Sequence, residues 1–219
     1  MSGVLRMPPG PGLDGLSLVA EAAPVPREGP EFTGAGIPRD AEWLEADGLG
    51  GFASGTVGGL RTRRYHGILT PAIHPPTARA VLVNGYDAWI ETGHGAPQFL
   101  SAQRYVPDAG PARGVERLVD FTADPWPRWR FRLDGGGRVE CERFVPHRRA
   151  AVALRWRLMD RGGSQPALLH VRPFLSCRDL HATHHENADF RFEGTVTGDA
   201  VRWRPYAAMP AIVSRANAT

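Results

Sequence analysis

The chain has 219 residues, including 26 glycines and 20 prolines, a composition that favours many short strands joined by turns over long helices. Every one of its 26 lysine-or-arginine positions is arginine, and 23 interspersed acidic residues leave a modest formal charge of +3. This balance does not indicate a nucleic-acid partner. The glycine and proline content leads us to expect an all-β chain with one large domain.

Residues 1–38 hold seven prolines and seven glycines and show no sustained hydrophobic periodicity. Such a segment cannot bury enough apolar surface to offset the entropy lost on ordering, so we expect a flexible extension. The N-terminus lacks the basic start and the continuous apolar run of a signal peptide. No run of about 18 apolar residues follows, which predicts a cytoplasmic protein with no membrane partner.

The next segment, "RDAEWLEADG" at residues 39–48, predicts at most one or two helical turns before glycines stop the helix. The glycines that follow do not fit a dinucleotide fingerprint, because further glycines would break the helix that it requires. A phosphate-binding P-loop needs a lysine, which this chain lacks, and Ser54 is not centred in a nucleophile elbow. With these three motifs excluded, the segment is a glycine-rich stretch followed by the basic run 61–66. The structural interpretation of this segment is a turn before a solvated strand.

From residue 80 onward the hydrophobic pattern has a period of two. In "AAVALRWRLMD" the side chains of Val152, Leu154, Trp156 and Leu158 are expected on one face. The other face carries Arg155 and Arg157. The pattern predicts an antiparallel β-sandwich.

Two further features sit within these predicted strands. The sequence "WRFRLDGGGRVECERFV" predicts a hairpin that turns at Asp134–Gly137, because glycine tolerates positive φ. Cys141 and Cys177 fall at strand positions where a small apolar residue would serve equally well. We expect both to be free core thiols.

The stretch "EWLEADGLGGFASGTVGGLRTRRYHGILTPA", residues 42–72, resembles the opening of the N-terminal domain of bacterial and archaeal-type glycogen debranching enzymes, the amylo-α-1,6-glucosidase family. The resemblance continues through "ARAVLVNGYDAWIE", "LVDFTADPWPRWRF" and "VRPFLSCRDLHATHHEN", and so covers about residues 42–210. It implies an all-β, antiparallel β-sandwich (supersandwich-like) with few short helices at 39–219. It also implies that an (α/α)₆ catalytic domain, absent from this chain, follows the β-sandwich. Because the chain ends in a strand-like run, we expect it to be truncated before that domain.

In the family, that barrel carries the two general acid/base carboxylates for hydrolysis of α-1,6-glucosidic branch linkages in glycogen. The resemblance therefore implies no catalytic residue here, and a role in packing on the barrel and shaping an α-glucan site. The family more often has asparagine at the position of Asp47. Candidates for substrate binding or the domain interface are Gly50, Gly51, Arg64, Tyr65, His66, Arg178, Asp179 and His181.

Two tryptophans lie near arginines, and one of them joins this list of candidates. Trp129 alternates with Phe131 and Leu133, which predicts a core position. Trp126 lies between two prolines and is the candidate for an exposed sugar contact, because aromatic faces stack on the apolar faces of sugar rings.

The cluster His181, His184, His185 and Glu186 suggests a metal because imidazole and carboxylate suit zinc or iron. The spacing matches no common ligand motif, and adjacent histidines on a strand would point to opposite faces. We predict no metal and no cofactor.

A hidden glycosidase would need two carboxyl groups about 5 to 9.5 Å apart. Candidates exist, but no spacing in the sequence nominates a pair: Glu42, Glu45, Asp47 and Asp179. The main hypothesis is the accessory domain of a debranching enzyme. The alternatives are a free-standing α-glucan-binding module and a metal-dependent β-sandwich enzyme that uses His181 and His184.

Overall fold

The computed structural model describes residues 4–6, 31–33, 36–92, 95–103, 114–160 and 167–217. Its elements there are strands in three antiparallel sheets and one short helix, α1 (Gly114–Arg117). The predicted all-β class and β-sandwich-like arrangement are confirmed.

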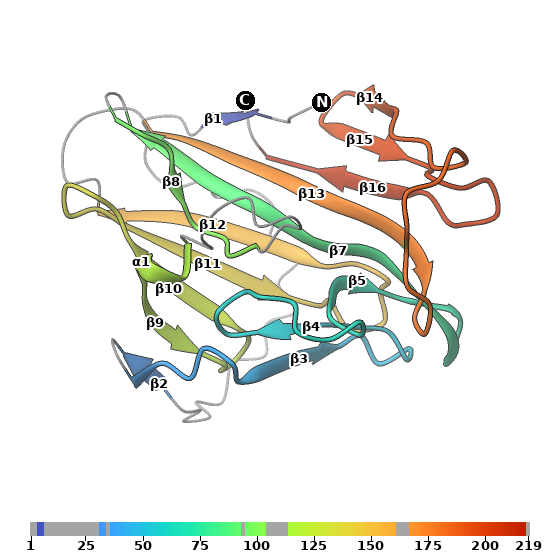
Figure 1. Ribbon diagram of the computed structural model, residues 1–219, viewed down its shortest axis with the longest axis horizontal. Helices are drawn as coiled ribbons and strands as arrows, with labels where there is room; N and C mark the ends of the chain where they lie inside the picture. The colour runs from blue at the N-terminus through green and yellow to red at the C-terminus, as the bar shows by residue number, and fades with distance from the viewer. Residues whose placement is uncertain are drawn as a thin grey trace.

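The first sheet has eight strands. Its path is β1 (Val4–Arg6), β13 (Ala167–Asp179), β7 (Thr77–Thr92), β5 (Gly67–Thr70), β4 (Phe52–Thr56) and β3 (Glu42–Ala46), with β6 (Ala72–His74) and β8 (Gln98–Phe99) also paired to β7. The second, five-stranded sheet has the order β12 (Ala153–Asp160), β11 (Arg138–Phe144), β10 (Arg128–Arg132), β9 (Leu118–Thr122) and β2 (Glu31–Thr33). The third contains β14 (Gly194–Thr197), β15 (Ala200–Trp203) and β16 (Ile212–Arg215). The first two sheets form separate layers, and the small third sheet lies beside β13 (Figure 1).

The core between the layers is centred on Trp129, which is fully buried as predicted. Its indole nitrogen donates to the carbonyl of Val57, 2.7 Å away, and so joins β10 to the end of β4. The edge of Trp43 packs against its ring with centroids 5.5 Å apart. Because a buried tryptophan contributes both apolar area and this hydrogen bond, we expect Trp129 to stabilise the fold by about 3–5 kcal/mol.

An arginine also enters this core, which the sequence pattern did not predict. The guanidinium of Arg143 lies 4.0 Å from the ring centroid of Trp129, and its Nε donates to the Tyr86 hydroxyl at 2.9 Å. Burial raises the pKa of Tyr86 well above its ordinary value, so its hydroxyl stays protonated. The aromatic faces and the hydroxyl replace the water that the guanidinium gives up.

Residues 42–46 form strand β3, so the prediction of a helical turn there is wrong. Trp43 is buried whereas the neighbouring Leu44 is 61% exposed, which is the alternation of a strand. The strand pairs with β4 along its whole length. Tertiary pairing thus overrides the helix-compatible local composition.

Several other local predictions are confirmed. The β10–β11 hairpin turns through Gly135 and Gly136, both at positive φ. Leu154, Trp156 and Leu158 of β12 pack against the core while Arg155 and Arg157 face outward. Cys141 and Cys177 are buried free thiols, and burial raises the pKa of Cys177 to about 11.

Of residues 1–38, the structure describes 4–6, 31–33 and 36–38. Strand β1 pairs with β13 and β2 pairs with β9. The rest of the extension lies outside the described residues, and its flexibility stays a prediction. In the part of the chain that the structure describes, no helix is long and apolar enough to cross a membrane.

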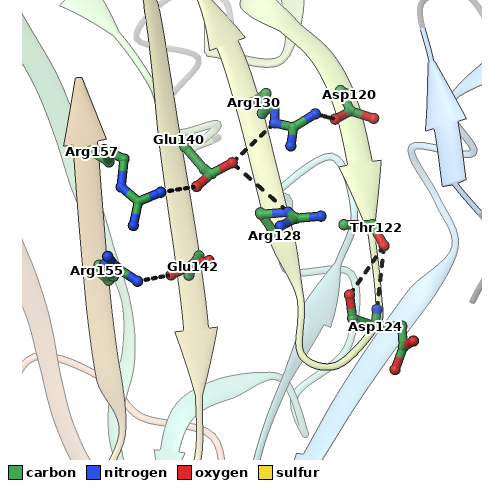
Figure 2. A network of polar contacts seen from close by, with 9 residues as sticks. All are labelled: Asp120, Thr122, Asp124, Arg128, Arg130, Glu140, Glu142, Arg155 and Arg157. Atoms are coloured by element: carbon green, nitrogen blue, oxygen red, sulfur yellow. Dashed lines mark hydrogen bonds and ion pairs between the residues drawn. The ribbon is translucent and has the colours of Figure 1, made fainter. Parts of the chain in front are cut away.

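The outer face of the five-stranded sheet carries a ladder of cross-strand ion pairs (Figure 2). Glu140, on β11, accepts from Arg130 Nε at 3.0 Å and lies 3.7 Å from Arg157 Nη1. Arg130 continues to Asp120 at 2.8 Å, and Arg155 pairs with Glu142 at 3.3 Å. The register places these partners directly opposite one another, as cross-strand pairing requires.

Candidate functional site

The glycine stretch forms a closed turn at residues 47–51, between β3 and β4. Asp47 is buried, and its Oδ1 accepts from the amides of Leu49 at 2.7 Å and Gly51 at 2.8 Å. Its own amide donates to the Gly51 carbonyl at 3.0 Å. Because a single side-chain oxygen accepts both hydrogen bonds, an asparagine at this position would make the same turn.

Gly50 needs to be glycine for two reasons. Its φ is +98°, and a Cβ at this position would lie 2.5 Å from the Pro76 carbonyl oxygen. Its carbonyl accepts a hydrogen bond from Arg79 Nε. The close approach that the glycines permit is therefore to other parts of the same domain.

The basic run forms a second turn at residues 61–66, ahead of β5. His66 points inward and is buried. Its Nδ1 accepts from the Thr62 amide at 3.2 Å, which places the proton of the neutral ring on Nε2, 3.2 Å from Glu42 Oε1. Burial and the nearby charges of Arg63 and Arg61 lower the pKa of His66, and together they outweigh the opposing effect of Glu42. His66 thus supports the turn rather than facing outward with its two neighbours.

Those neighbours, Arg64 and Tyr65, meet the segment that follows β13. Arg64 Nη1 donates to the His181 carbonyl at 2.8 Å. The Tyr65 hydroxyl lies 3.3 Å from His181 Nδ1, and the two rings meet edge to face at 5.7 Å. All three residues are exposed. The structure therefore brings together two predicted clusters that are more than a hundred positions apart in the sequence.

Arg178 fixes this meeting point from the β13 side. Its Nη2 donates to the Arg64 carbonyl. Its Nη1 lies within 3.2 Å of the carbonyls of Asp179, Leu180 and Ala182. Among the residues that the structure describes, Arg64 and Arg178 make no salt bridge, and their partners are backbone oxygens.

We call residues 47–51, 61–66 and 178–182 the arginine-pinned loops. Arg79 joins the first loop to the third, because its side chain binds Gly50 and its carbonyl accepts from the Leu180 amide at 3.1 Å. Burial lowers the pKa of Arg178, and the nearby charges of Arg61 and Arg64 lower it further. Because Arg64 and Arg178 bind backbone carbonyls rather than carboxylates, the loops present a cationic, hydrogen-bonded surface.

The predicted site residues thus divide into three groups. Gly50, Gly51, Arg64, Tyr65, Arg178, Asp179 and His181 lie in the arginine-pinned loops. His66 lies in the same loops but is buried. Trp126 precedes β10 and is half-buried, with its ring 5.3 Å from that of Phe144. The role of each in sugar binding stays a prediction.

The four carboxylates considered for glycosidase chemistry have different surroundings. Glu42 pairs with Arg63 and His66, and Asp47 binds the amides of its own turn. Asp179 accepts from the His181 amide at 2.8 Å. Burial raises the pKa of Glu45, which lies on β3 between Glu42 and Asp47. None of these contacts joins one carboxylate to another.

The predicted histidine cluster is spread along the segment after β13. His181 contacts Tyr65, whereas His184 Nε2 lies 2.7 Å from the Tyr206 hydroxyl. Within the described ranges, no group of three or more His, Cys, Asp or Glu side chains could hold a metal ion. The absence of a cofactor stays a prediction.

Sequence reasoning missed the aromatic side chains that pack beside His184. Residues 188–193, "ADFRFE", have the period-two pattern of a strand, but the strand begins only at Gly194. Phe190 and Phe192 precede it on an irregular segment, where Phe190 packs against both Tyr206 and Phe192. Their alternation with charged residues concealed them, because it is also the pattern of a half-buried strand.

Comparison with known proteins gives one match. The family model described as "Glycogen debranching enzyme N terminal" matches residues 41–218. No curated protein and no solved structure matches the chain.

Proposed function

Because the chain belongs to the glycogen debranching enzyme N-terminal family, we propose that it is an accessory domain that packs on a catalytic domain and shapes an α-glucan site. The catalytic partner implied by the family is an (α/α)₆ barrel with its own pair of carboxylates. The reaction served is hydrolysis of α-1,6-glucosidic branch linkages in glycogen.

The observation that carries this proposal is the pinning of Arg64 and Tyr65 against His181. Arginine hydrogen bonds to backbone carbonyls hold two distant loops in one geometry while the Tyr65 and His181 side chains stay exposed. Fixed loops with exposed polar and aromatic groups suit contact with a second domain or a sugar chain. Tyrosine and histidine both hydrogen bond to sugar hydroxyls.

The test uses a debranching enzyme that carries this chain as its N-terminal domain. Arg64→Ala removes the donor to the His181 carbonyl and should lower the debranching rate on limit dextrin by about tenfold, consistent with about 1–3 kcal/mol for a lost hydrogen bond in a site. The melting temperature should change little, because both groups are exposed. The matched control is Arg202→Ala, on an exposed position of β15.

Two results would contradict the proposal. One is an unchanged rate in the Arg64→Ala enzyme. The other is robust debranching by the 219-residue chain alone, since the proposal places both catalytic carboxylates on the partner domain.

The alternative of a free-standing α-glucan-binding module is favoured by one observation, the exposed ring of Phe192, which packs against Phe190. It predicts binding of malto-oligosaccharides in the micromolar range by the chain alone. The accessory-domain proposal predicts a Kd of about 1 mM or weaker, since half of a composite site supplies about −4 kcal/mol.

A further inference from the structure

The segment after β13 and the loop that joins β15 to β16 both lie near the small third sheet (Figure 1). Five of their side chains form a cluster. We call it the aromatic patch, and it consists of His184, Asn187, Phe190, Phe192 and Tyr206. A backbone hydrogen bond of 3.0 Å from Arg191 to Pro205 holds the two segments together. The patch is therefore an ordered surface built from two loops.

Phe192 is the most exposed large apolar side chain in the described part of the chain, at 75%. Its ring lies 4.6 Å from that of Phe190, which in turn meets Tyr206 edge to face at 5.3 Å. The two phenylalanine rings are tilted by 49° relative to each other, so Phe190 packs against one side of Phe192. An aromatic ring held in this way offers a flat apolar surface to a ligand.

Polar groups surround the rings. The Tyr206 hydroxyl receives a hydrogen bond from Asn187 Nδ2 at 2.8 Å and lies 2.7 Å from His184 Nε2. Asn187 Nδ2, which can only donate, also lies 3.4 Å from His184 Nε2, so we assign Nε2 as an acceptor that receives the Tyr206 proton. Burial, Arg178 and His185 all lower the pKa of His184, which favours the neutral ring. The ring proton then sits on Nδ1, on an exposed side chain, where it can donate to a ligand.

We propose that the aromatic patch is an α-glucan contact in which the apolar face of a glucose unit packs on Phe192 while its hydroxyls bond to His184 and Asn187. This combination of an open aromatic face with neutral donors and acceptors matches a sugar, which is apolar on its ring faces and polar at its edge. A purely apolar protein surface would cover the exposed imidazole of His184 without offering a partner to its Nδ1 proton. The proposal rests on the proposed function for its choice of α-glucan, and it extends the glucan surface from His181 to the third sheet.

The experiment titrates the 219-residue chain with maltoheptaose and follows amide shifts by NMR. We expect weak saturable binding, weakened about fivefold to tenfold by Phe192→Ala and retained by Phe192→Tyr, which keeps the aromatic face. Leu44→Ala is the matched control, because Leu44 is similarly exposed at 61% but lies on β3. It should leave binding unchanged.

The inference is overturned if wild type shows no saturable shifts, or if Phe192→Ala binds maltoheptaose as wild type does. A Phe192→Ala variant that instead loses association with the catalytic domain, with sugar binding intact, would make the patch a protein interface and would also overturn it. Failure of the proposal for the aromatic patch is distinct from failure of the proposed accessory role. That role depends on the debranching rate of the Arg64→Ala enzyme, which this titration does not measure.

Discussion

Arginine side chains stabilise both the five-stranded sheet and the arginine-pinned loops, but they bind different partners. On the sheet, Arg130 and Arg155 pair with carboxylates that stand directly opposite on neighbouring strands (Figure 2). In the loops, Arg64 and Arg178 bind backbone carbonyls, and Tyr65 and His181 stay exposed beside them.

The difference has a physical consequence for function. The ladder sets each arginine against a carboxylate, so most of its charge is offset within the sheet and its contacts stabilise the strand arrangement. The loops keep their positive charge, because a carbonyl satisfies a guanidinium's hydrogen bonds without neutralising it. Such loops are both fixed and able to bind, which is the combination that a site needs.

The largest expected effect is that of Gly50→Ala, which tests whether the loops are fixed by close packing. We expect a loss of about 3 kcal/mol or more in the free energy of unfolding, from the left-handed φ and from overlap with Pro76. Chemical denaturation measures this loss. Gly135→Ala is the control, since Gly135 has a similar φ of +85° and nothing within 4 Å of its Cβ position. Equal losses in the two variants would show that the contact with Pro76 is unimportant.

The next effect concerns the ladder. Glu140→Gln leaves Arg128, Arg130 and Arg157 without their shared negative charge. The Glu140 side chain is only 4% exposed but its partners are a third to a half exposed, so we expect a loss of about 2 kcal/mol, below that of a fully buried pair. Thermal unfolding should show it, and added salt should reduce the difference. Glu193→Gln, at an exposed position, should have no effect. A salt-independent loss would contradict an ionic origin.

A smaller effect is expected from Arg178→Ala, which removes hydrogen bonds to four carbonyls. Three of these carbonyls, those of Arg64, Asp179 and Ala182, belong to exposed residues and can reach water, so the expected loss is about 1 kcal/mol and independent of salt, in contrast to the ladder. Hydrogen exchange should become faster in residues 179–182. Arg178→Lys should restore little of the protection, because an ammonium cannot reproduce the planar fork. Full rescue by lysine would mean that charge alone pins the loops.

The smallest effect is a dependence of stability on pH through His66. Its pKa is lowered in the folded state, so above the ordinary value of 6.5 the ring is neutral in both states and costs nothing. As pH falls below 6.5, the unfolded state takes up the proton first and folding becomes less favourable. We expect wild type to lose up to about 1 kcal/mol more than His66→Gln between pH 7.5 and 5.5. Parallel pH profiles for the two proteins would show that His66 does not contribute.

Local alternation and turn chemistry were enough to predict several features of the fold. The strand at 153–160, the hairpin at Gly135 and Gly136, and the buried positions of Trp129 and Cys141 were all predicted. Their physical basis is local, because a period of two places side chains on alternate faces and glycine alone tolerates positive φ without cost.

The sequence also placed Arg64, Tyr65 and His181 among the candidates, through the family resemblance. It did not show that they touch, because their contact depends on β5 and β13 both pairing with β7. Hydrogen bonds to carbonyls leave no trace in a sequence, since every residue supplies the same acceptor. The inward orientation of His66, the strand at residues 42–46 and the aromatic patch likewise depend on contacts between segments that are distant in the sequence, which local patterns do not record.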